Sequence, residues 1–175
     1  MTSRKFLNSL ANGKKDILRI FLGILAKTKT GYCVIGGLAV NAYAEPVVSL
    51  DLDIVVATED ADKMLRAATL KGFKAKKFEH SVNLTSPDSD LRIQVQTDTR
   101  YQDFLAGAIF REVLGYKMKV AVVEDVLQGK IWAYSDVTRR NSKRQKDLAD
   151  IMRLVEARPA LKRRLPAKLR KLAGI

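Results

Sequence analysis

The apolar run Val48–Ala57 contains two aspartates one residue apart, and this feature constrains the fold more than any other part of the sequence. A near-continuous apolar run of this length is typical of a strand that is covered on both faces. Because side chains i and i+2 of a strand point to the same side, Asp51 and Asp53 are predicted to share one face. Two carboxylates that close repel each other and need a counterion.

A divalent cation is one such counterion. Mg²⁺ prefers hard oxygen ligands and is usually bound together with substrate phosphates. The alternative is that Asp51 and Asp53 lie at an exposed strand end and pair with Lys or Arg. Both readings place a charged site at this strand.

Two glycines precede this strand in a second informative pattern. The sequence predicts a short strand over Tyr32–Ile35, a tight turn at Gly36-Gly37 and a short helix over Leu38–Ala44, which ends near Pro46. Glycine lets the backbone approach a ligand closely, so a strand, Gly-Gly and helix in this order suit a phosphate site. A plain strand-to-helix turn is the alternative.

The remaining periodicities predict alternating helices and strands. Helices are expected near 6–27, from a cap at Thr58 or Asp60 to about Leu70, and over 101–108, 124–135 and 143–157. Strands are expected over 73–84 and 91–97, with turn residues at 85–90 between them. Two further short strands, hinged at Gly115, are expected within 111–123. The basic segment after Pro159 is expected to hold one more amphipathic helix. The predicted class is α/β, with a small mixed sheet flanked by helices.

The positive charge lies mainly at the end of the chain. The net charge is +13, and residues 137–175 contain 13 Lys or Arg against 3 Asp or Glu. This asymmetry favours a polyanionic partner, with RNA or DNA ahead of a membrane, although a solvated basic helix face is equally compatible. The expected RNA-binding residues are Arg163, Arg164, Lys168, Arg170 and Lys171.

Composition excludes several other classes of protein. The chain has 175 residues and is 47% hydrophobic, which is enough for a core. Its longest apolar stretches are too short to span a bilayer, its start does not resemble a secretory signal, and its one cysteine cannot form an internal disulfide. We therefore expect a cytoplasmic protein with no membrane partner. Cys33 is expected in the core, and Trp132 in the core rather than as a base-stacking platform.

The stretch YCVIGGLAVNAYAEPVVSLDLDIVV resembles the nucleotidyltransferase fold of the polymerase-beta type, and within it the AbiEii-like toxin nucleotidyltransferases. Their pattern is a strand, Gly-Gly or Gly-Ser, a helix and an R-x-T-x-D-I-D strand. A lysine on a later helix and an R-D-x-x-D stretch complete it, and the matching positions here include Lys130, Asp147 and Asp150. The resemblance covers roughly residues 30–157. It implies a nucleotidyltransferase core over 1–123 and a basic helical part over 124–175.

The resemblance implies transfer of a nucleotidyl group from a nucleoside triphosphate to an acceptor, RNA such as tRNA or a protein. Asp51 and Asp53 would hold Mg²⁺ or Mn²⁺. Gly36, Gly37, Ser49 and Lys130 would contact the nucleotide, and Asp147 or Asp150 would activate the acceptor or support the site. The family also implies a toxin paired with an antitoxin. The alternatives for the rear residues are a solvated Lys130, and aspartates that pair locally with Lys143, Lys146 or Arg153.

Three positions depart from the family pattern. Val47 stands where the family has arginine, Ser49 where it has threonine, and Gln94 where many relatives have a third carboxylate. An amide offers a ligating oxygen but no charge and no base. Two other functions therefore stay open: a degenerate member that binds nucleotide or RNA without catalysis, and an interaction module that reuses the fold.

Overall fold

The structure is a computed structural model that describes residues 2–172. One sheet contains seven strands: β1 (Tyr32–Ile35), β2 (Asp51–Val56), β3 (Lys74–Lys77), β4 (Ser81–Ser86), β5 (Ser89–Gln96), β6 (Ile109–Val113) and β7 (Tyr116–Val120). The α-helices are α1 (Ser3–Leu10), α2 (Ile17–Lys27), α3 (Gly36–Val40), α4 (Ala61–Leu70), α5 (Val123–Ser135), α6 (Asn141–Ala157) and α7 (Ala167–Leu172). Three short 3₁₀ helices are η1 (Thr58–Asp60), η2 (Thr99–Leu105) and η3 (Pro159–Arg164).

The sheet is mixed, with the strand order β3-β4-β5-β2-β1-β7-β6. Strand β2 lies near its centre, antiparallel to β1 and parallel to β5. Its register sets Asp51 opposite Arg92 and Asp53 opposite Gln94. The predicted α/β class with a mixed sheet flanked by helices is confirmed.

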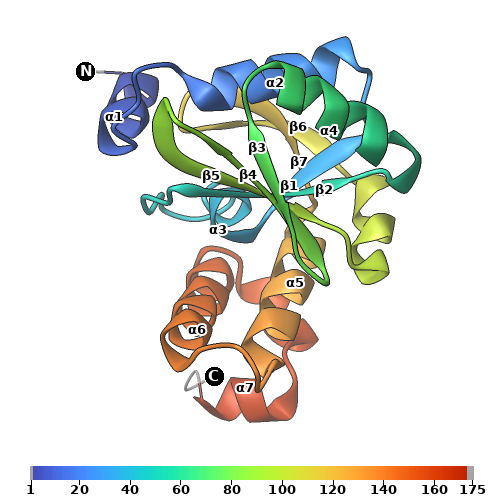
Figure 1. Cartoon of the computed structure of the whole chain (residues 1–175). Helices are drawn as coiled ribbons and strands as arrows, with labels where there is room; N and C mark the ends of the chain where they lie inside the picture. The colour runs from blue at the N-terminus through green and yellow to red at the C-terminus, as the bar shows by residue number, and fades with distance from the viewer. Residues whose placement is uncertain (1, 173–175) are drawn as a thin grey trace.

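The helices form layers on both sides of the sheet (Figure 1). Helices α2 and α4 lie along one side, and α3 lies on the other side together with α5 and α6. In β2 the fully buried Leu52 and Ile54 alternate with the half-buried Asp51 and Asp53. Alternation places the apolar side chains of the strand in the core and both carboxylates on the side of α5 and α6.

The predicted single helix near 6–27 is wrong, because the structure has two helices here. The first ends at Leu10 with Ala11 as its C-cap, and Asn12 after it adopts a positive φ of 46°. Asp16 then caps α2 by accepting a hydrogen bond from the Arg19 backbone N–H at 3.0 Å. The apolar residues Ile17, Phe21, Ile24 and Leu25, which recur at helical spacing, are all buried residues of α2.

The single strand predicted over 73–84 is also wrong, because this segment folds into the antiparallel pair β3 and β4. The chain turns at Phe78, whose backbone N–H donates to the Ser81 carbonyl at 2.8 Å. The predicted turn over 85–90 is shorter than expected, since β4 extends to Ser86 and β5 begins at Ser89.

Several element boundaries also shift. Strand β2 begins at Asp51 rather than at Val48, and the side chains of Val47 and Val48 are about half exposed. Helix α3 begins directly at Gly36 and ends at Val40, so no separate turn precedes it. Asp60 is not a side-chain cap, because its carboxylate accepts the Gly31 backbone N–H at 2.8 Å.

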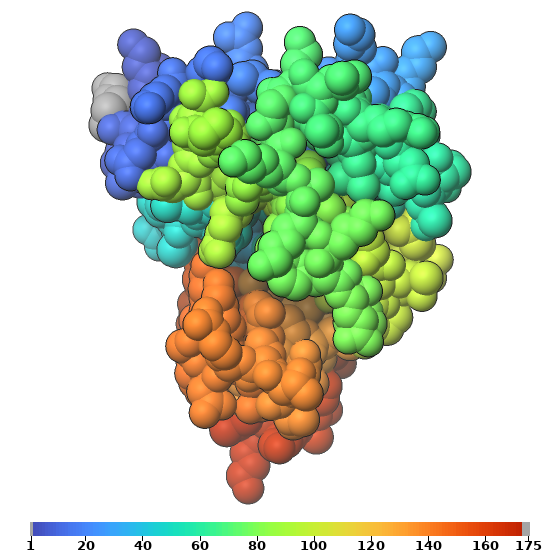
Figure 2. All heavy atoms as spheres, viewed as in Figure 1, coloured from blue at the N-terminus to red at the C-terminus, as the bar shows by residue number. Residues whose placement is uncertain are grey.

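The predicted strand pair hinged at Gly115 is confirmed as β6 and β7, and the two long rear helices are confirmed as α5 and α6. The segment expected over 101–108 is the 3₁₀ helix η2. The basic end forms η3 and the short helix α7, and its last residues, 173–175, lie outside the described part. Helices α5–α7 group at the lower end of the molecule, with α7 farthest from the sheet (Figures 1 and 2). None of the helices within residues 2–172 has the length and apolar composition that a membrane crossing requires.

Candidate active site

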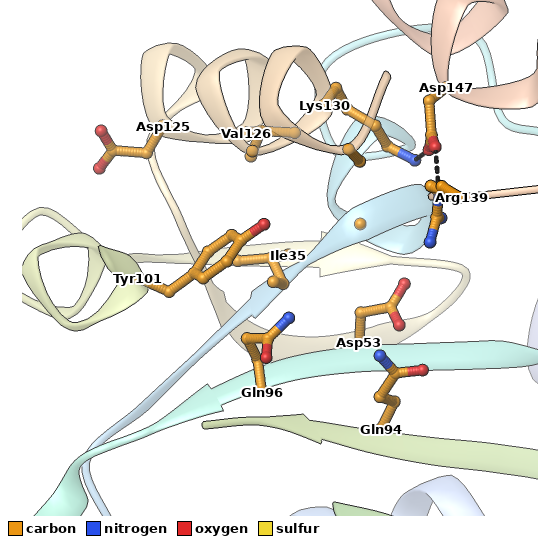
Figure 3. A pocket seen from close by; sticks show the side chains of 13 residues that line it. Ile35, Asp53, Gln94, Gln96, Tyr101, Asp125, Val126, Lys130, Arg139 and Asp147 are labelled. Carbon is orange, nitrogen blue, oxygen red and sulfur yellow. Dashed lines mark hydrogen bonds and ion pairs between the residues drawn. The ribbon is translucent and has the colours of Figure 1, made fainter. Parts of the chain in front are cut away.

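Both aspartates of β2 line the hollow between the sheet and helices α5 and α6, and Figure 3 shows the Asp53 carboxylate directed into it. Asp53 lies between Ile35 of β1 and Gln94 of β5 in the register of the sheet. The position where many relatives of the resembled family have a third carboxylate is therefore the immediate neighbour of Asp53, and here it is an amide.

Gly36 is required at the end of β1 for two reasons. Its φ is +68°, in the left-handed region that side chains disfavour, and a Cβ atom at this position would collide with the Asp53 carboxylate. Gly37 is less constrained, since its Cβ would lie 3.6 Å from the Ser49 hydroxyl. The backbone at Gly36 thus passes close to the Asp53 carboxylate.

Ser49 is buried directly before β2. Its hydroxyl lies 3.3 Å from both the backbone nitrogen and the carbonyl oxygen of Asp51. Ser49 and Gly37 also line the same hollow as the two aspartates. In this structure the Ser49 hydroxyl holds the backbone from which Asp51 projects.

Asp53 is a half-buried carboxylate without an ion-pair partner among the described residues. Burial raises its pKa, Lys130 lowers it, and the nearby charge of Asp51 raises it again, with a net result above the ordinary value of 3.8. The site therefore holds an oxygen ligand that lacks a cation.

Asp51 is neutralised by protein cations. Its Oδ1 accepts a hydrogen bond from Arg92 Nε at 2.9 Å, and Lys143 Nζ lies 3.8 Å from its Oδ2. The alternative of a strand-end aspartate paired with Lys or Arg therefore holds for Asp51 but not for Asp53. Sequence reasoning missed Arg92, whose signal was its place two residues before Gln94 on the neighbouring strand.

Lys130 is buried on α5 and joins two aspartates of α6. Its Nζ lies 2.9 Å from Asp147 Oδ1 and 2.6 Å from Asp150 Oδ2. Burial alone would lower the pKa of Lys130, but the carboxylates of Asp150 and Asp147 outweigh it and the pKa is raised. The alternative of a solvated Lys130 is wrong.

Two arginines complete this network. Arg139 Nε donates to Asp147 Oδ2 at 2.7 Å, and Arg153 donates to Asp150 Oδ1 at 2.7 Å. Local pairing along the helix, the alternative for these aspartates, holds only for Asp150 with Arg153. The main partner of Asp147 is Lys130, which lies on a different helix.

Two hollows meet at this network. The cationic hollow is lined by Gly37, Ser49, Asp51, Asn83, Arg92, Lys143 and Lys146. The polar hollow is lined by Ile35, Gly36, Gln96, Tyr101, Asp125, Val126, Gly129 and Ala133. Asp53, Gln94, Lys130, Arg139 and Asp147 line both. The predicted residues Gly36, Gly37, Ser49, Asp51, Asp53, Lys130 and Asp147 therefore line one or both hollows, whereas Asp150 lines neither and contacts the site through Lys130.

The residues present suit Mg²⁺ that is bound together with phosphates, rather than a preformed metal cage. Within residues 2–172 no three acidic, His or Cys side chains cluster closely enough to hold a metal ion by themselves. Mg²⁺ commonly uses one or two carboxylates and takes its other ligands from substrate phosphates and water. Asp53, which lacks a cation, and Asp51 beside it fit that requirement.

The other candidates lie away from the chemistry. Cys33 is fully buried in the core, as predicted, and burial raises the pKa of its thiol to about 12. Trp132 packs against Tyr101 and Phe104. The predicted RNA-binding residues of η3 and α7 are exposed, but none lines either hollow, and α7 is the helix farthest from the sheet (Figure 1).

No protein-family model and no curated protein matches the chain. Solved structures do match its fold. The structure of ANT(2″)-Ia in complex with adenylyl-2″-tobramycin has a TM-score of 0.60 at 13% identity, over 90% of this chain and 93% of that one. The lincosamide antibiotic adenylyltransferase LnuA, bound to lincomycin, has a TM-score of 0.57 at 12% identity, over 81% of this chain and 98% of that one.

A putative nucleotidyltransferase from Thermotoga maritima has a TM-score of 0.54 at 19% identity, over 75% of this chain and 86% of that one. Identities this low show the fold alone. The fold of the chain is therefore the nucleotidyltransferase fold, as predicted from the Gly-Gly and Asp-x-Asp pattern. The narrower AbiEii-like assignment stays a prediction.

Proposed function

We propose that the chain transfers a nucleotidyl group from a nucleoside triphosphate to an acceptor, with Mg²⁺ or Mn²⁺ as cofactor. One observation supports this above the others. Residues from β2, β5, α5, α6 and the segment between these two helices, far apart in the sequence, bring four carboxylates and five cationic side chains to one pair of hollows in a nucleotidyltransferase fold.

In this proposal the triphosphate lies in the cationic hollow. Lys130, Arg139 and Lys146 are the cations there that do not contact Asp51. Gly37 would let the backbone approach the phosphates there, with Ser49 beside it, and Gly36 would contact the nucleotide from the polar hollow. Asp51 and Asp53 would hold Mg²⁺, which when bound supplies charge neutralisation for a transferring phosphoryl group.

The transfer itself is a single displacement. The acceptor oxygen forms a bond to the α-phosphorus, the bond from that phosphorus to the bridging oxygen of the β-phosphate breaks, pyrophosphate leaves, and the acceptor proton is released to water. Catalysis of this kind depends on positioning and charge stabilisation. Asp147 is assigned the role of positioning Lys130 and Arg139, because both of its oxygens are already paired with them.

RNA, such as tRNA, is the acceptor that we propose first, followed by protein. The exposed basic residues of η3 and α7 support it as an electrostatic surface for a polyanion. Small hydroxylated molecules are a third class to screen, since the matched structures include an adenylylated tobramycin and bound lincomycin. A cytoplasmic toxin with a cognate antitoxin is the setting that the family resemblance suggests.

Binding without catalysis is the second candidate function. Arg92 neutralises Asp51 and Gln94 replaces a carboxylate beside Asp53, so the free site has fewer uncompensated charges for metal than a three-carboxylate site. This arrangement supports a nucleotide-binding or RNA-binding protein if no transfer occurs.

The deciding experiment uses α-labelled nucleoside triphosphates with Mg²⁺ or Mn²⁺ and total RNA, total protein or a panel of aminoglycosides. Label that becomes attached to an acceptor in the wild type, and not in Asp53→Asn, supports the transferase. The matched control is Asp62→Asn, which removes the same charge from an exposed position on α4. No transfer, combined with a metal-dependent rise in melting temperature on nucleotide addition, would instead support binding without catalysis. If the wild type transfers no label and nucleotide does not raise its melting temperature, both the transferase and the nucleotide-binding readings fail.

A further inference from the structure

The two hollows differ in charge, and this difference divides a nucleotide between them. Arg92, Lys143 and Lys146 line only the cationic hollow. The residues that line only the polar hollow include one charged side chain, Asp125, and it is acidic. Phosphates are therefore favoured on one side of Asp53, and an uncharged group on the other.

Gln96 presents a hydrogen-bond donor to the polar hollow. Its side-chain oxygen accepts from the backbone N–H groups of Thr97 at 3.1 Å and Asp98 at 3.3 Å. Because both backbone groups are hydrogen-bond donors, the amide atom that faces them must be the oxygen. The NH₂ group of Gln96 therefore faces away from them. Figure 3 shows the nitrogen of Gln96 directed into the hollow between Tyr101 and Asp53.

The loop that orients Gln96 is held rigidly. Asp98 caps η2 by accepting the Arg100 backbone N–H at 3.0 Å, and its carboxylate also accepts from the Arg100 guanidinium at 2.7 Å. The same guanidinium lies 5.1 Å from the centre of the Trp132 ring. A donor held in this way is organised before a ligand arrives, which is what selective recognition requires.

The rest of the polar hollow suits a flat, uncharged ring. Ile35, Val126 and Ala133 contribute apolar surface. Gly129 allows the Tyr101 ring to pack closely, since a Cβ there would lie 3.3 Å from it, and the Tyr101 hydroxyl points into the hollow (Figure 3). Apolar surface beside fixed polar groups allows a nucleobase or a similar ring to pack on one side and form hydrogen bonds on the other.

We propose that the polar hollow receives the nucleobase of the triphosphate, and that Gln96 is a specificity-determining residue whose NH₂ group donates to a base carbonyl. The proposal rests on the proposed function, because it assigns the phosphates to the cationic hollow. Bases with a carbonyl at the recognised edge, uracil and guanine, are preferred over their amino counterparts, cytosine and adenine.

The test reverses the polarity of this one group. Gln96→Glu keeps an oxygen for the Thr97 and Asp98 backbone N–H groups and replaces the NH₂ donor by an acceptor of nearly the same shape. Binding of the α,β-methylene analogues of UTP, CTP, GTP and ATP is measured by calorimetry with Mg²⁺ on the full chain. Ratios within the pairs UTP:CTP and GTP:ATP cancel the repulsion that the new charge exerts equally on all four.

The proposal expects Gln96→Glu to lower at least one of the two affinity ratios by about tenfold relative to the wild type, since a mispaired polar group in a buried site costs on the order of one hydrogen bond. The control Gln128→Glu adds the same charge on α5 at a side chain that lines neither hollow, and its ratios should match the wild type.

Unchanged ratios in Gln96→Glu, with all four analogues still bound, overturn the nucleobase assignment and leave the proposed function standing. If Gln96→Glu alters only the transfer rate at saturating nucleotide, the polar hollow would hold the acceptor instead. That result also overturns the nucleobase assignment and leaves the proposed function standing. If the wild type binds none of the four analogues, the proposed function itself fails, and this inference fails with it.

Discussion

Removing the Lys130 ammonium group tests whether the buried network between α5 and α6 holds the site together. Lys130 is 8% exposed, against 39% for Arg139 and 20% for Arg153, so it is the most buried cation of the three. Asp147 Oδ1 and Asp150 Oδ2 each have Lys130 as their close partner among the described residues. In Lys130→Met both oxygens stay buried and lose that partner.

The expected loss of stability follows from these two oxygens. A buried polar group left without a partner costs about 1–3 kcal/mol, and more when it is charged. Breaking a buried ion pair from one side costs about 3–5 kcal/mol. We expect Lys130→Met to lower the free energy of unfolding by about 3–5 kcal/mol, which for a domain of this size lowers the melting temperature by roughly 10 °C.

Urea unfolding of the wild type and of four variants measures this effect. Arg139→Met removes a half-exposed partner of Asp147 and should cost about 1 kcal/mol or less. Asp150→Asn and the double variant Lys130→Met/Asp150→Asn complete a cycle. The double variant should be more stable than the sum of the single effects predicts, by about 1–3 kcal/mol, because the uncompensated carboxylate is gone. A loss below about 1 kcal/mol in Lys130→Met, or strict additivity in the cycle, would refute a structural role for Lys130.

The remaining predictions concern the sheet side of the site and the basic end. Asp53→Asn should be more stable than the wild type in metal-free buffer at neutral pH. Because the pKa of Asp53 is raised, the folded wild type binds this proton more tightly than the unfolded chain does. The stability of the wild type therefore falls as the pH rises from the ordinary value of 3.8 through the folded pKa. In melting experiments the stability advantage of Asp53→Asn should vanish below pH 3.8. Gly36→Ala should lose about 2 kcal/mol or more in urea unfolding, whereas Gly72→Ala, which has a φ of +89° and no atom near its Cβ, should lose only about 1 kcal/mol. Gln94→Asp should raise Mg²⁺ or Mn²⁺ affinity in calorimetry, and unchanged affinity would place Gln94 outside the metal site. RNA binding through the exposed basic residues of 163–171 should weaken steeply between low and moderate salt in a filter assay, and salt-independent binding would contradict an electrostatic surface.

The sequence was sufficient to predict the part of the site that is local in the chain. Gly36, Asp51 and Asp53 lie within 18 residues, and their roles follow from turn geometry and from the two-residue period of a strand. Their placement on one face of a central strand was predicted from this periodicity and is confirmed. Lys130 and Asp147 were predicted from a family pattern, and their pairing across two helices was not.

The missed features depend on contacts between distant segments. Arg92 pairs with Asp51 because β2 and β5 are parallel in one particular register, and periodicity within either strand does not specify that register. The helix break before α2 and the hairpin at Phe78 were missed because the predicted periods were extended across short polar turns, Asn-Gly-Lys-Lys-Asp at 12–16 and Glu-His at 79–80. Asn12, with a positive φ, and Asp16, as a cap, were the local signals for the first of these breaks.

The same cations can serve two states of the site. In the free chain Arg92 and Lys143 neutralise Asp51, while Asp53 stays without a cation and has a raised pKa. If the triphosphate enters with Mg²⁺, the carboxylates acquire a stronger counterion. Arg92 and Lys143, which line the same hollow, can then contact the phosphates. In the loaded state both carboxylates and the phosphates then have counterions, whereas in the free state Asp53 lacks one. This exchange favours joint binding of metal and nucleotide over binding of either alone, because each alone leaves one set of charges uncompensated.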